Sequence, residues 1–509
     1  MSAQLEIHDL VVRYPGRTER ALDGVTLDLG PKDLVGVTGR TGSGKSTLAL
    51  AAAGLLPRVI RASVSGSVTV DGQDAVRATA AQLAGRVGIV FSAPALQLSA
   101  SKPTVREELA FGLENLAVQR ADMDGRIDAA MARLGITHLA ERDPLTLSGG
   151  EQQRVAIASI VVMGTDVLVL DEPAAQLDPA GTESVAAMLA EMAGDGRAVL
   201  VAEHAPQILL KTGRCLVLDG GRVIAETSPR EALAADEAAG DELEAMPAVG
   251  RSIRSVPPVA IAVNDLTHRY PGGIEAVRAV SLSVAAGESV AIVGQNGSGK
   301  TTLAKHLNGL LRPESGYVSL DGKDIADRAI NQLAGLVGFV FQNPDDQLFN
   351  NSVEKEVGFG PRNLRLDPAS VSHLVDGALA MTGLTGRRGE NPYDLDVSTR
   401  KLVALAGVLA MEPPVLVMDE PTMGQDPLGT RRIGAIVDAW RGAGRTVIAI
   451  THDMDFAAHH FERIVVMRGG EIILDADPAS VFAASNTALL ATTGLRPPLR
   501  EVGKGEIWP

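Results

Sequence analysis

The stretch GRTGSGKST at residues 39–47 decides the fold, and it recurs as GQNGSGKTT at residues 294–302. Each copy follows an apolar run, LVGVT at 34–38 and SVAIV at 289–293, and precedes a helical segment. Glycines at this spacing let backbone N–H groups wrap around a phosphate chain, and the N-terminus of the following helix adds its positive end. The repeated pattern therefore predicts two phosphate-binding loops, each between a strand and a helix.

Most of the chain is written twice, with the second copy roughly 250 residues after the first. The other recurring pairs are RYPG at 13–16 and 269–272, VGIVF at 87–91 and VGFVF at 337–341, VLVLDEP at 167–173 and VLVMDEP at 415–421, and AEH at 202–204 and ITH at 450–452. A period of this length indicates a duplicated domain, because stacked structural repeats are much shorter.

The order of the motifs predicts an α/β fold in each copy. Apolar strands alternate with helical stretches, which favours a mostly parallel sheet covered by helices. The segment VREELAFGLENLAVQ at 105–119 is typical of helices and predicts a separate helical lobe. We therefore predict two tandem nucleotide-binding domains of the P-loop NTPase class at 1–234 and 259–485, with a linker at 235–258 and a mobile tail at 486–509.

Composition limits the class of protein. The 509 residues are 45% hydrophobic but only 3% aromatic, so the cores must be built mainly from aliphatic side chains. The net charge of −15 argues against a nucleic-acid partner and disfavours unaided binding to anionic lipid. The apolar runs are shorter than the ~20 residues that a membrane span needs, and the first residues do not resemble a signal segment. The single cysteine, Cys215, excludes an internal disulfide framework, and we expect a soluble cytoplasmic chain.

Two acidic residues end each VLVxDE strand. Asp171 and Asp419 come first, and Glu172 and Glu420 follow directly. Beside a phosphate loop, the aspartate is placed to bind Mg²⁺ and the glutamate is placed to polarise water. A strand that ends in Asp-Glu is weak evidence for a nucleotide site by itself, but it is strong evidence when it follows a matching phosphate loop.

A histidine and a tyrosine also recur in both copies. His204 and His452 follow the next apolar strand, at the edge where an α/β sheet binds its ligands. Either histidine alone would be read as a surface residue, but their recurrence favours contact with the γ-phosphate. Tyr14 and Tyr270 could pack in a core, but their recurrence in so aromatic-poor a chain favours stacking on adenine.

These motifs predict two sites for ATP and Mg²⁺. The predicted ATP-binding residues are Tyr14, Gly39, Gly42, Gly44, Lys45, Ser46 and Thr47 in the first copy, and Tyr270, Gly294, Gly297, Gly299, Lys300, Thr301 and Thr302 in the second. The predicted Mg²⁺ ligands are Ser46, Asp171, Thr301 and Asp419, and the predicted catalytic residues are Glu172, His204, Glu420 and His452.

The segment LSGGEQQR at 147–154 is more specific than the phosphate loop. Together these motifs resemble the ATP-binding cassette (ABC) ATPases, whose signature this segment matches, and the resemblance covers nearly the whole of both copies. It implies two ABC-type nucleotide-binding domains that pair head to tail within the chain and enclose two MgATP. Each ATP would lie between the phosphate loop of one copy and the signature of the other, which adds Ser148, Gly149 and Gly150 to the expected binding residues.

The segment VFQNPDDQLF at 340–349 resembles the ATPase components of energy-coupling factor (ECF) importers, which take up vitamins and transition-metal ions. The resemblance implies that Gln342 contacts Mg²⁺ and the attacking water, and that Asp345 and Asp346 face a membrane scaffold, although both could equally form a solvated turn. The first copy reads VFSAPALQLSA, with Ser92 in place of the glutamine. The implied protein is an ATP-hydrolysing translocase subunit, peripheral on the cytoplasmic face of the cell membrane, with separate scaffold and substrate-binding membrane subunits.

The second copy has an altered signature, LDVSTRK at 395–401. Asp396 aligns with Ser148 and Val397 with Gly149. A carboxylate that faces the γ-phosphate would be unfavourable, since two like charges ~4 Å apart repel by about 4 kcal/mol at an effective dielectric of about 20. Unless Asp396 turns away or is protonated, we expect this surface to bind ATP poorly.

Head-to-tail pairing would place two departures in the same composite site. Site one would combine Lys45, Ser92, Asp171, Glu172 and His204 with the altered signature, and site two would combine Lys300, Gln342, Asp419, Glu420 and His452 with LSGGE. Independent drift at two surface loops is the alternative explanation. Our hypothesis is one efficient hydrolytic site, site two, and one slow or ATP-holding site, site one.

Three other functions are alternatives to the importer. The fused ATPase of a sugar importer also has two tandem copies, but DDQLF argues against it. A soluble twin-cassette factor acting on ribosomes would carry a charged helical linker and a basic surface. A chromosome-organising ATPase would need a long coiled-coil insertion, and no sustained heptad run is visible.

Overall fold

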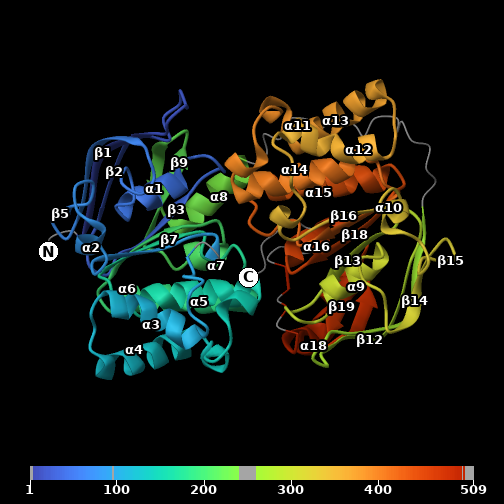
Figure 1. Ribbon diagram of the computed structural model, residues 1–509, viewed down its shortest axis with the longest axis horizontal. Coiled ribbons are helices and arrows are strands. Elements are labelled where there is room, and N and C mark those ends of the chain that lie inside the picture. Colours follow the sequence, from blue (N-terminus) through green and yellow to red (C-terminus); the bar gives the residue numbers. More distant parts are fainter. Residues whose placement is uncertain (1–3, 95–96, 240–258, 494, 496, 499–509) are drawn as a thin grey trace. The chain divides into compact units, whose positions relative to one another are not determined.

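The computed structural model describes residues 4–94, 97–239, 259–493, 495 and 497–498. They belong to two compact units, Met1–Asp241 and Glu242–Pro509. Each unit contains one copy of the duplicated motifs (Figure 1). In the described parts of the chain, no helix is long and apolar enough to span a bilayer.

The first unit is built on a six-stranded sheet. Its strands are β3 Leu34–Thr38, β6 Val87–Val90, β7 Val167–Asp171, β8 Ala198–Ala202, β9 Arg214–Asp219 and β10 Arg222–Thr227. Their order is β10-β9-β3-β8-β7-β6, parallel throughout except for the antiparallel β10. Because the parallel strands run the same way, the segments that follow β3, β7 and β8 leave the sheet at one edge.

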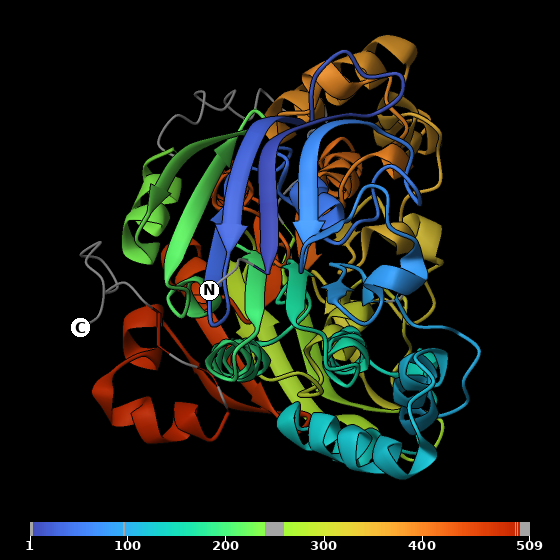
Figure 2. The same cartoon turned by 90° about the vertical axis from the view of Figure 1, so that its left-hand side faces the viewer.

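A smaller antiparallel sheet covers one face of the first unit. Its strands are β1 Leu5–Arg13, β2 Leu22–Leu29, β4 Ser63–Val70 and β5 Gln73–Asp74, in the order β2-β1-β4-β5. Figure 2 shows β1, β2 and β4 side by side as blue arrows. Helix α1, Lys45–Ala52, shares one hydrophobic core with this sheet and with β3.

The central strand β7 separates two hydrophobic cores. Val167 and Val169 belong to the core that contains α1 and the small sheet, whereas Leu168 and Leu170 belong to the core under the helical lobe. Successive side chains of a strand point to opposite faces, and a strand covered on both faces is apolar throughout. The run VLVLD therefore forms a strand that is buried on both faces.

The helical lobe of the first unit contains α3 Val105–Asn115, α4 Arg120–Arg133 and α5 Gly149–Val161, which contact one another. This confirms the predicted lobe, although α3 ends before residue 119 because Ala117 adopts a left-handed backbone with φ of 54°. The remaining helices are α2 Ala80–Leu83, α6 Pro179–Gly194, α7 Pro206–Leu209, α8 Pro229–Ala239, and the short 3₁₀ turns η2 Thr137–Leu139 and η3 Pro144–Thr146.

The second unit repeats the same plan. Its six-stranded sheet has the order β16-β17-β18-β13-β19-β20, and its small sheet has the order β12-β11-β14-β15. The strands are β11 Ile261–Arg269, β12 Glu275–Val284, β13 Ser289–Val293, β14 Ser315–Leu320, β15 Lys323–Asp324, β16 Val337–Val340, β17 Val415–Asp419, β18 Thr446–Thr451, β19 Arg463–Arg468 and β20 Glu471–Ala476.

Helices of the second unit cover both faces of its sheets (Figure 1). They are α9 Lys300–Leu307, α10 Ile330–Leu333, α11 Val353–Val357, α12 Phe359–Asn363, α13 Pro368–Thr382, α14 Val397–Leu409, α15 Pro427–Gly442, α16 Met454–His460, α17 Pro478–Val481 and α18 Thr487–Ala491, with 3₁₀ turns η5 Pro344–Asp346, η6 Thr385–Arg387, η7 Pro392–Asp394 and η8 Ala484–Asn486. Helices α11 to α14 form the lobe that corresponds to α3, α4 and α5.

Two predicted boundaries differ from the structure. Helix α8 continues to Ala239, past the boundary predicted at 234, and the rest of the predicted linker lies outside the described residues. The tail is predicted from residue 486, and the structure has α18 at the start of this segment, with Leu490 and Leu495 buried in the second unit's core. Residues 499–509 lie outside the described residues.

Candidate active site

Each phosphate loop is held by a buried strand on one side and a helix on the other. In the second unit the loop runs from the end of β13 to the start of α9, and Gly299 immediately before the helix has φ of 100°. A Cβ atom at Gly299 would lie 2.2 Å from the carbonyl oxygen of Ala276. Only glycine therefore fits this turn.

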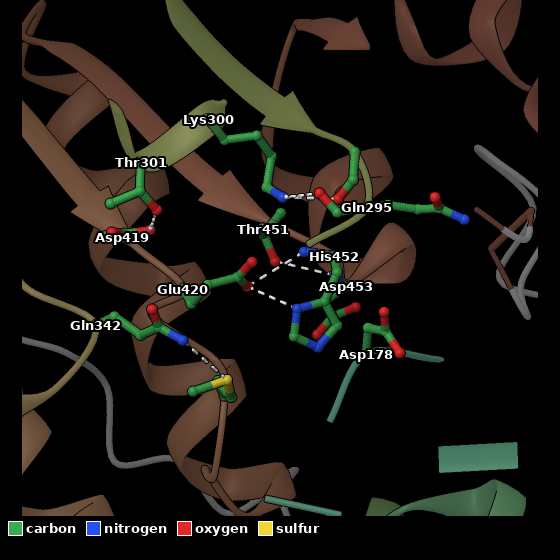
Figure 3. Close-up of polar contacts among 12 residues, drawn as sticks. Asp178, Gln295, Lys300, Thr301, Gln342, Asp419, Glu420, Thr451, His452 and Asp453 are labelled. Atoms are coloured by element: carbon green, nitrogen blue, oxygen red, sulfur yellow. Dashed lines mark hydrogen bonds and ion pairs between the residues drawn. The ribbon is translucent and has the colours of Figure 1, made fainter. Parts of the chain in front are cut away.

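The polar groups of the loops fit a phosphate chain. Lys300 is buried, and its Nζ donates to the carbonyl oxygens of Gly294 at 2.7 Å and Gln295 at 2.9 Å (Figure 3). Lys45 makes the same bond to Gly39 at 2.6 Å. The hydroxyl of Ser298 is buried and has no hydrogen-bond partner among the described residues, as expected of a donor that binds a ligand.

The two predicted Mg²⁺ ligands of each unit lie in direct contact. The Thr301 hydroxyl donates to Asp419 at 3.2 Å (Figure 3). The Ser46 hydroxyl donates to Asp171 at 3.1 Å. Burial raises the pKa of Asp419 to about 6, and the neighbouring Glu420 carboxylate adds to this shift. Burial likewise raises the pKa of Asp171 to about 6. A hydroxyl beside one carboxylate fits Mg²⁺, which also takes oxygen ligands from phosphates and water.

Glu420 and His452 form a buried pair at the ends of β17 and β18. Nδ1 of His452 donates to Oε2 of Glu420 at 2.9 Å, and the backbone N–H of His452 donates to the same oxygen at 3.2 Å (Figure 3). Burial opposes both charges, but the pairing outweighs it, so the pKa of Glu420 is lowered and the pKa of His452 is raised. Glu420 is therefore an ionised carboxylate in a fixed orientation, as a base that polarises water requires.

The first unit differs at the same edge because Glu203 lies between β8 and His204. Glu203 is buried, and its carboxylate accepts the backbone N–H groups of Ala174 at 3.0 Å, His204 at 2.8 Å and Ala205 at 3.1 Å. The corresponding residue in the second unit is Thr451. The difference between AEH and ITH was the available sequence signal for this extra buried carboxylate.

The signature of the first unit starts helix α5. Ser148 caps the helix, and both its N–H and its hydroxyl donate to Oε2 of Glu151 at 2.8 Å. At the next residue, Gly149, a Cβ would lie 2.3 Å from Oε1 of Gln176, so a side chain there would require the Gln176 side chain to move. The predicted binding residues Ser148, Gly149 and Gly150 thus lie at an exposed helix N-terminus, which suits an anion.

The altered signature of the second unit caps its helix with Asp396. Its two oxygens accept the N–H and the hydroxyl of Thr399, both at 2.8 Å, so the carboxylate turns back onto α14. Asp396 therefore adopts the turned-away orientation, in which its carboxylate does not directly repel a γ-phosphate. Val397 is 38% exposed and follows the cap, and Gly424 stands where the first unit has Gln176, which gives the larger side chain room.

The two recurring tyrosines are anchored to the helices that follow the phosphate loops. The Tyr14 and Thr47 hydroxyls lie 3.2 Å apart, as do the Tyr270 and Thr302 hydroxyls. The Tyr270 side chain is half-exposed. These bonds fix each ring beside its loop, and adenine stacking stays a prediction.

Gln342 follows β16 and is exposed. Its Nε2 lies 3.7 Å from Sδ of Met423, in the turn after Glu420 (Figure 3). Lys300, Thr301, Gln342, Asp419, Glu420 and His452 are thus brought to one edge of the second sheet (Figure 3). In the first unit, Ser92 follows β6 at the aligned position.

Comparison with known proteins decides the family. The profile of the ABC transporter family matches residues 22–175 and 277–423. This chain belongs to the ABC transporter family. An ABC transporter ATP-binding protein of Methanosarcina acetivorans is 36% identical, and the match covers 98% of this chain and 89% of the relative. A second such protein, from Methanosarcina mazei, is 34% identical over 98% of this chain and 92% of its own length.

Solved structures of single ABC ATPases match parts of the chain. CbiO1 of Clostridium perfringens, described as part of the ABC transporter complex CbiONQ, is 38% identical with a TM-score of 0.41, covering 46% of this chain and 94% of that protein. MJ0796, solved as a dimer with ADP and phosphate, is 26% identical with a TM-score of 0.41, covering 43% of this chain and 98% of that protein. Family membership establishes that this ABC ATPase is an ATP-binding, ATP-hydrolysing transporter component.

One buried residue of this ABC ATPase escaped the sequence reasoning in the second unit. Lys401 lies on α14, five residues after Asp396, and its side chain reaches the turn that follows Glu420. The sequence signal was present, since LDVSTRK has lysine where LSGGEQQ has Gln153. A lysine in a mostly apolar helix is more often a surface residue, so the contact needed the structure to reveal it.

Proposed function

We propose that this ABC ATPase is the energising subunit of an ECF-type importer of a vitamin or a transition-metal ion. The observation that carries the proposal is the surface of residues 340–349 in the second unit. Asp345 and Asp346 are exposed there, and Phe349 is 56% exposed with its ring centroid 4.6 Å from that of Phe359. An exposed aromatic pair beside acidic residues suits a protein interface, because aromatic side chains anchor such surfaces.

The first unit offers a different surface at the aligned position. Ser99 stands in place of Phe349, and the exposed Phe111 lies under Lys102, whose Nζ is 5.4 Å from the ring centroid. A cation over a ring partly satisfies its negative face. The two units therefore suit two different elements of one membrane scaffold.

The acidic stretch is also joined to the altered signature helix. Arg400 Nη1 on α14 lies 3.4 Å from Oδ1 of Asp345. Asp345 thus has a structural contact within the unit, and Asp346 is the better candidate for direct contact with a partner. A scaffold element that docks on η5 would act on α14 through this ion pair.

The proposed assembly places the chain on the cytoplasmic face of the membrane as a peripheral subunit. An integral scaffold subunit would bind the surface of residues 340–349, and a separate membrane subunit would bind the transported substrate. We propose no nucleic-acid partner, since a net charge of −15 repels a phosphate backbone.

Within the second unit, each polar group has a defined task. Lys300, the Ser298 hydroxyl and the backbone N–H groups of the loop would bind the terminal phosphates, and Thr301 and Asp419 would hold Mg²⁺ with Gln342 nearby. Bound Mg²⁺ would neutralise charge on the phosphates. Glu420 would orient the attacking water and take its proton, and His452 would keep Glu420 ionised and aligned.

We further propose head-to-tail pairing of the two units with two unequal sites. Site two contains the Glu420–His452 pair and would receive the intact signature of the first unit. Site one contains Ser92 and the extra Glu203 carboxylate, and it would receive the Asp396 cap. The additional buried carboxylate of Glu203 near Asp171 repels a triphosphate, which supports slower turnover at site one.

The test compares two catalytic glutamates in the assembled transporter. Glu420→Gln should abolish substrate uptake and steady-state ATP hydrolysis, whereas Glu172→Gln should leave most of both. Thermal unfolding with and without MgATP serves as the control that both variants fold and bind nucleotide. Loss of turnover in Glu172→Gln with little effect of Glu420→Gln would reverse the assignment.

The membrane partners are tested by affinity purification from detergent-solubilised membranes. We expect an integral scaffold and a small substrate-binding membrane protein to co-purify. A sugar-importer permease pair or ribosomes without membrane protein would contradict the ECF assignment while leaving the ATPase function intact.

A further inference from the structure

Lys401 is a buried lysine that touches the hydrolytic turn of the second unit. It is 6% exposed, and its Nζ donates to the carbonyl oxygen of Glu420 at 3.0 Å and to that of Met423 at 2.7 Å. Burial lowers the pKa of Lys401 to about 8, against the attraction of the Glu420 and Asp419 carboxylates. A buried ammonium is costly unless its N–H groups are bonded, so these two bonds fix where the side chain lies.

The turn that Lys401 contacts has a strained backbone. Glu420 has φ of 48°, in the left-handed region that residues other than glycine seldom occupy. The N–H of Met423 donates to the Glu420 carbonyl at 3.3 Å, and Lys401 supplies a second, charged donor to the same oxygen. Charged donors make stronger hydrogen bonds than neutral ones. Lys401 thus holds the backbone carbonyl of Glu420, and the Glu420 side chain must be aligned for catalysis.

Met423 extends this connection to the other side of the site. Its carbonyl accepts from Lys401, and its Sδ lies 3.7 Å from Nε2 of Gln342. Lys401, Met423, Glu420 and Gln342 therefore form one contiguous group, with both candidate water-contacting side chains attached to it. A displacement of α14 would move this group through Lys401.

The first unit has the same turn without this group. The N–H of Ala175 donates to the Glu172 carbonyl at 3.1 Å, and Glu172 has φ of 47°. The residue aligned with Lys401 is Gln153, whose Nε2 lies 3.5 Å from the carbonyl of Phe91. Ala175 aligns with Met423 and has no sulfur atom that could make the corresponding contact. The difference is specific to the unit that holds the Glu420–His452 pair.

We propose that Lys401 is a positioning residue for ATP hydrolysis in the second unit, which holds the Glu420 turn and its link to Gln342 in the productive arrangement. The inference rests on the proposed role of Glu420 as the base of site two. The altered signature helix α14 would then have a role other than binding ATP, because it carries Lys401, which supports the turn after Glu420.

The experiment measures steady-state ATP hydrolysis by the full chain with Lys401→Met, which keeps an unbranched apolar chain as far as Cε and removes the ammonium group. We expect kcat to fall about tenfold or more, equivalent to ~1.4 kcal/mol of barrier, with KM for ATP within about twofold of the wild type. Lys323→Met, which removes a charge from an exposed lysine on β15, is the control and should leave both constants unchanged.

A double-mutant comparison separates positioning from general damage. In a His452→Ala background, which should retain measurable turnover, Lys401→Met should lower kcat less than it does in the wild type, and ATP binding should be retained. A rise in KM with unchanged kcat, or fully additive losses with His452→Ala, would overturn the inference. If Glu420→Gln itself left turnover intact, the proposed function would fail instead.

Hydrogen exchange compares Lys401→Met with the wild-type chain. Residues 420–425 should exchange faster in the variant because the turn loses the two lysine bonds, whereas residues 172–177 should exchange as in the wild type, which controls for general unfolding. Unchanged exchange in 420–425 would show that Lys401 does not hold the turn and would overturn the inference.

Discussion

Replacing His452 should slow catalysis because Glu420 would lose the hydrogen bond that orients its carboxylate. The structure gives a bond of 2.9 Å between Nδ1 of His452 and Oε2 of Glu420, with side chains only 20% and 6% exposed. A hydrogen bond to a charged group contributes about 1.5–3 kcal/mol. If that energy aligns Glu420 in the transition state, His452→Ala should lower kcat by about tenfold to a hundredfold.

The same variant should change the pH dependence in a defined direction. The pKa of Glu420 is lowered because the attraction of His452 outweighs burial, so the active carboxylate persists to low pH. Without His452, burial dominates and the pKa of Glu420 rises. The acid limb of the kcat/KM profile should therefore move to higher pH, because the neighbouring charge is lost.

Folding stability offers a second readout for His452→Ala. Breaking a buried pair by removing one partner costs about 3–5 kcal/mol. The lowered pKa of Glu420 stabilises the fold fully above its ordinary value and less as pH falls through the lowered value. The raised pKa of His452 stabilises the fold fully below its ordinary value and less as pH rises through the raised value. The pair should thus contribute most between about pH 4.3 and 6.5.

The assay is stopped-flow or steady-state phosphate release across pH, paired with chemical unfolding, for His452→Ala and its counterpart His204→Ala. We expect the kinetic change in the first variant and a small change in the second. An unaltered acid limb in His452→Ala, or a larger loss in His204→Ala, would refute the reasoning about the buried pair.

Three further predictions follow from the geometry. Gly299→Ala should abolish nucleotide binding by the second unit, measured by calorimetry, because its Cβ would meet the Ala276 carbonyl at 2.2 Å; retained binding would show that the turn can open. Tyr270→Ala should weaken ATP affinity by about two- to tenfold if the ring stacks on adenine, with GTP affected equally; no change would remove the stacking role. Phe349→Asp should abolish co-purification of the membrane scaffold while ATP hydrolysis by the isolated chain persists, and unchanged co-purification would move the docking surface elsewhere.

The catalytic edge of the second sheet could be predicted because each residue follows a strand or a loop whose sequence pattern is local. The Asp419, Glu420 and His452 positions needed only the rule that parallel strands end at one edge. The orientation of Asp396 depends on Thr399, three residues later, which donates its N–H and hydroxyl to the carboxylate. In the first unit the direction is reversed, because Glu151 accepts from the N–H and hydroxyl of Ser148. The sequence shows a helix-capping pattern at this position. Only the structure shows that the Asp396 carboxylate caps the helix instead of facing a phosphate.

Other features depended on packing between distant segments. Lys401 reaches the Glu420 turn only because α14 lies against the strand end, which spacing in the sequence does not show. Leu490 and Leu495 of the C-terminal segment enter the second core, which their spacing in the sequence does not reveal. Isolated apolar residues predict burial only when the surface that they contact is known.

The left-handed backbone at Glu420 determines how a trapped transporter should be prepared. Non-glycine residues pay about 1–2 kcal/mol for this conformation, so a glycine variant would relax the turn as well as remove the base. Glutamine keeps the same backbone demand and the same side-chain length. An inactive chain made with glutamine should therefore keep the turn in its native shape, whereas one made with glycine should report on a loosened turn.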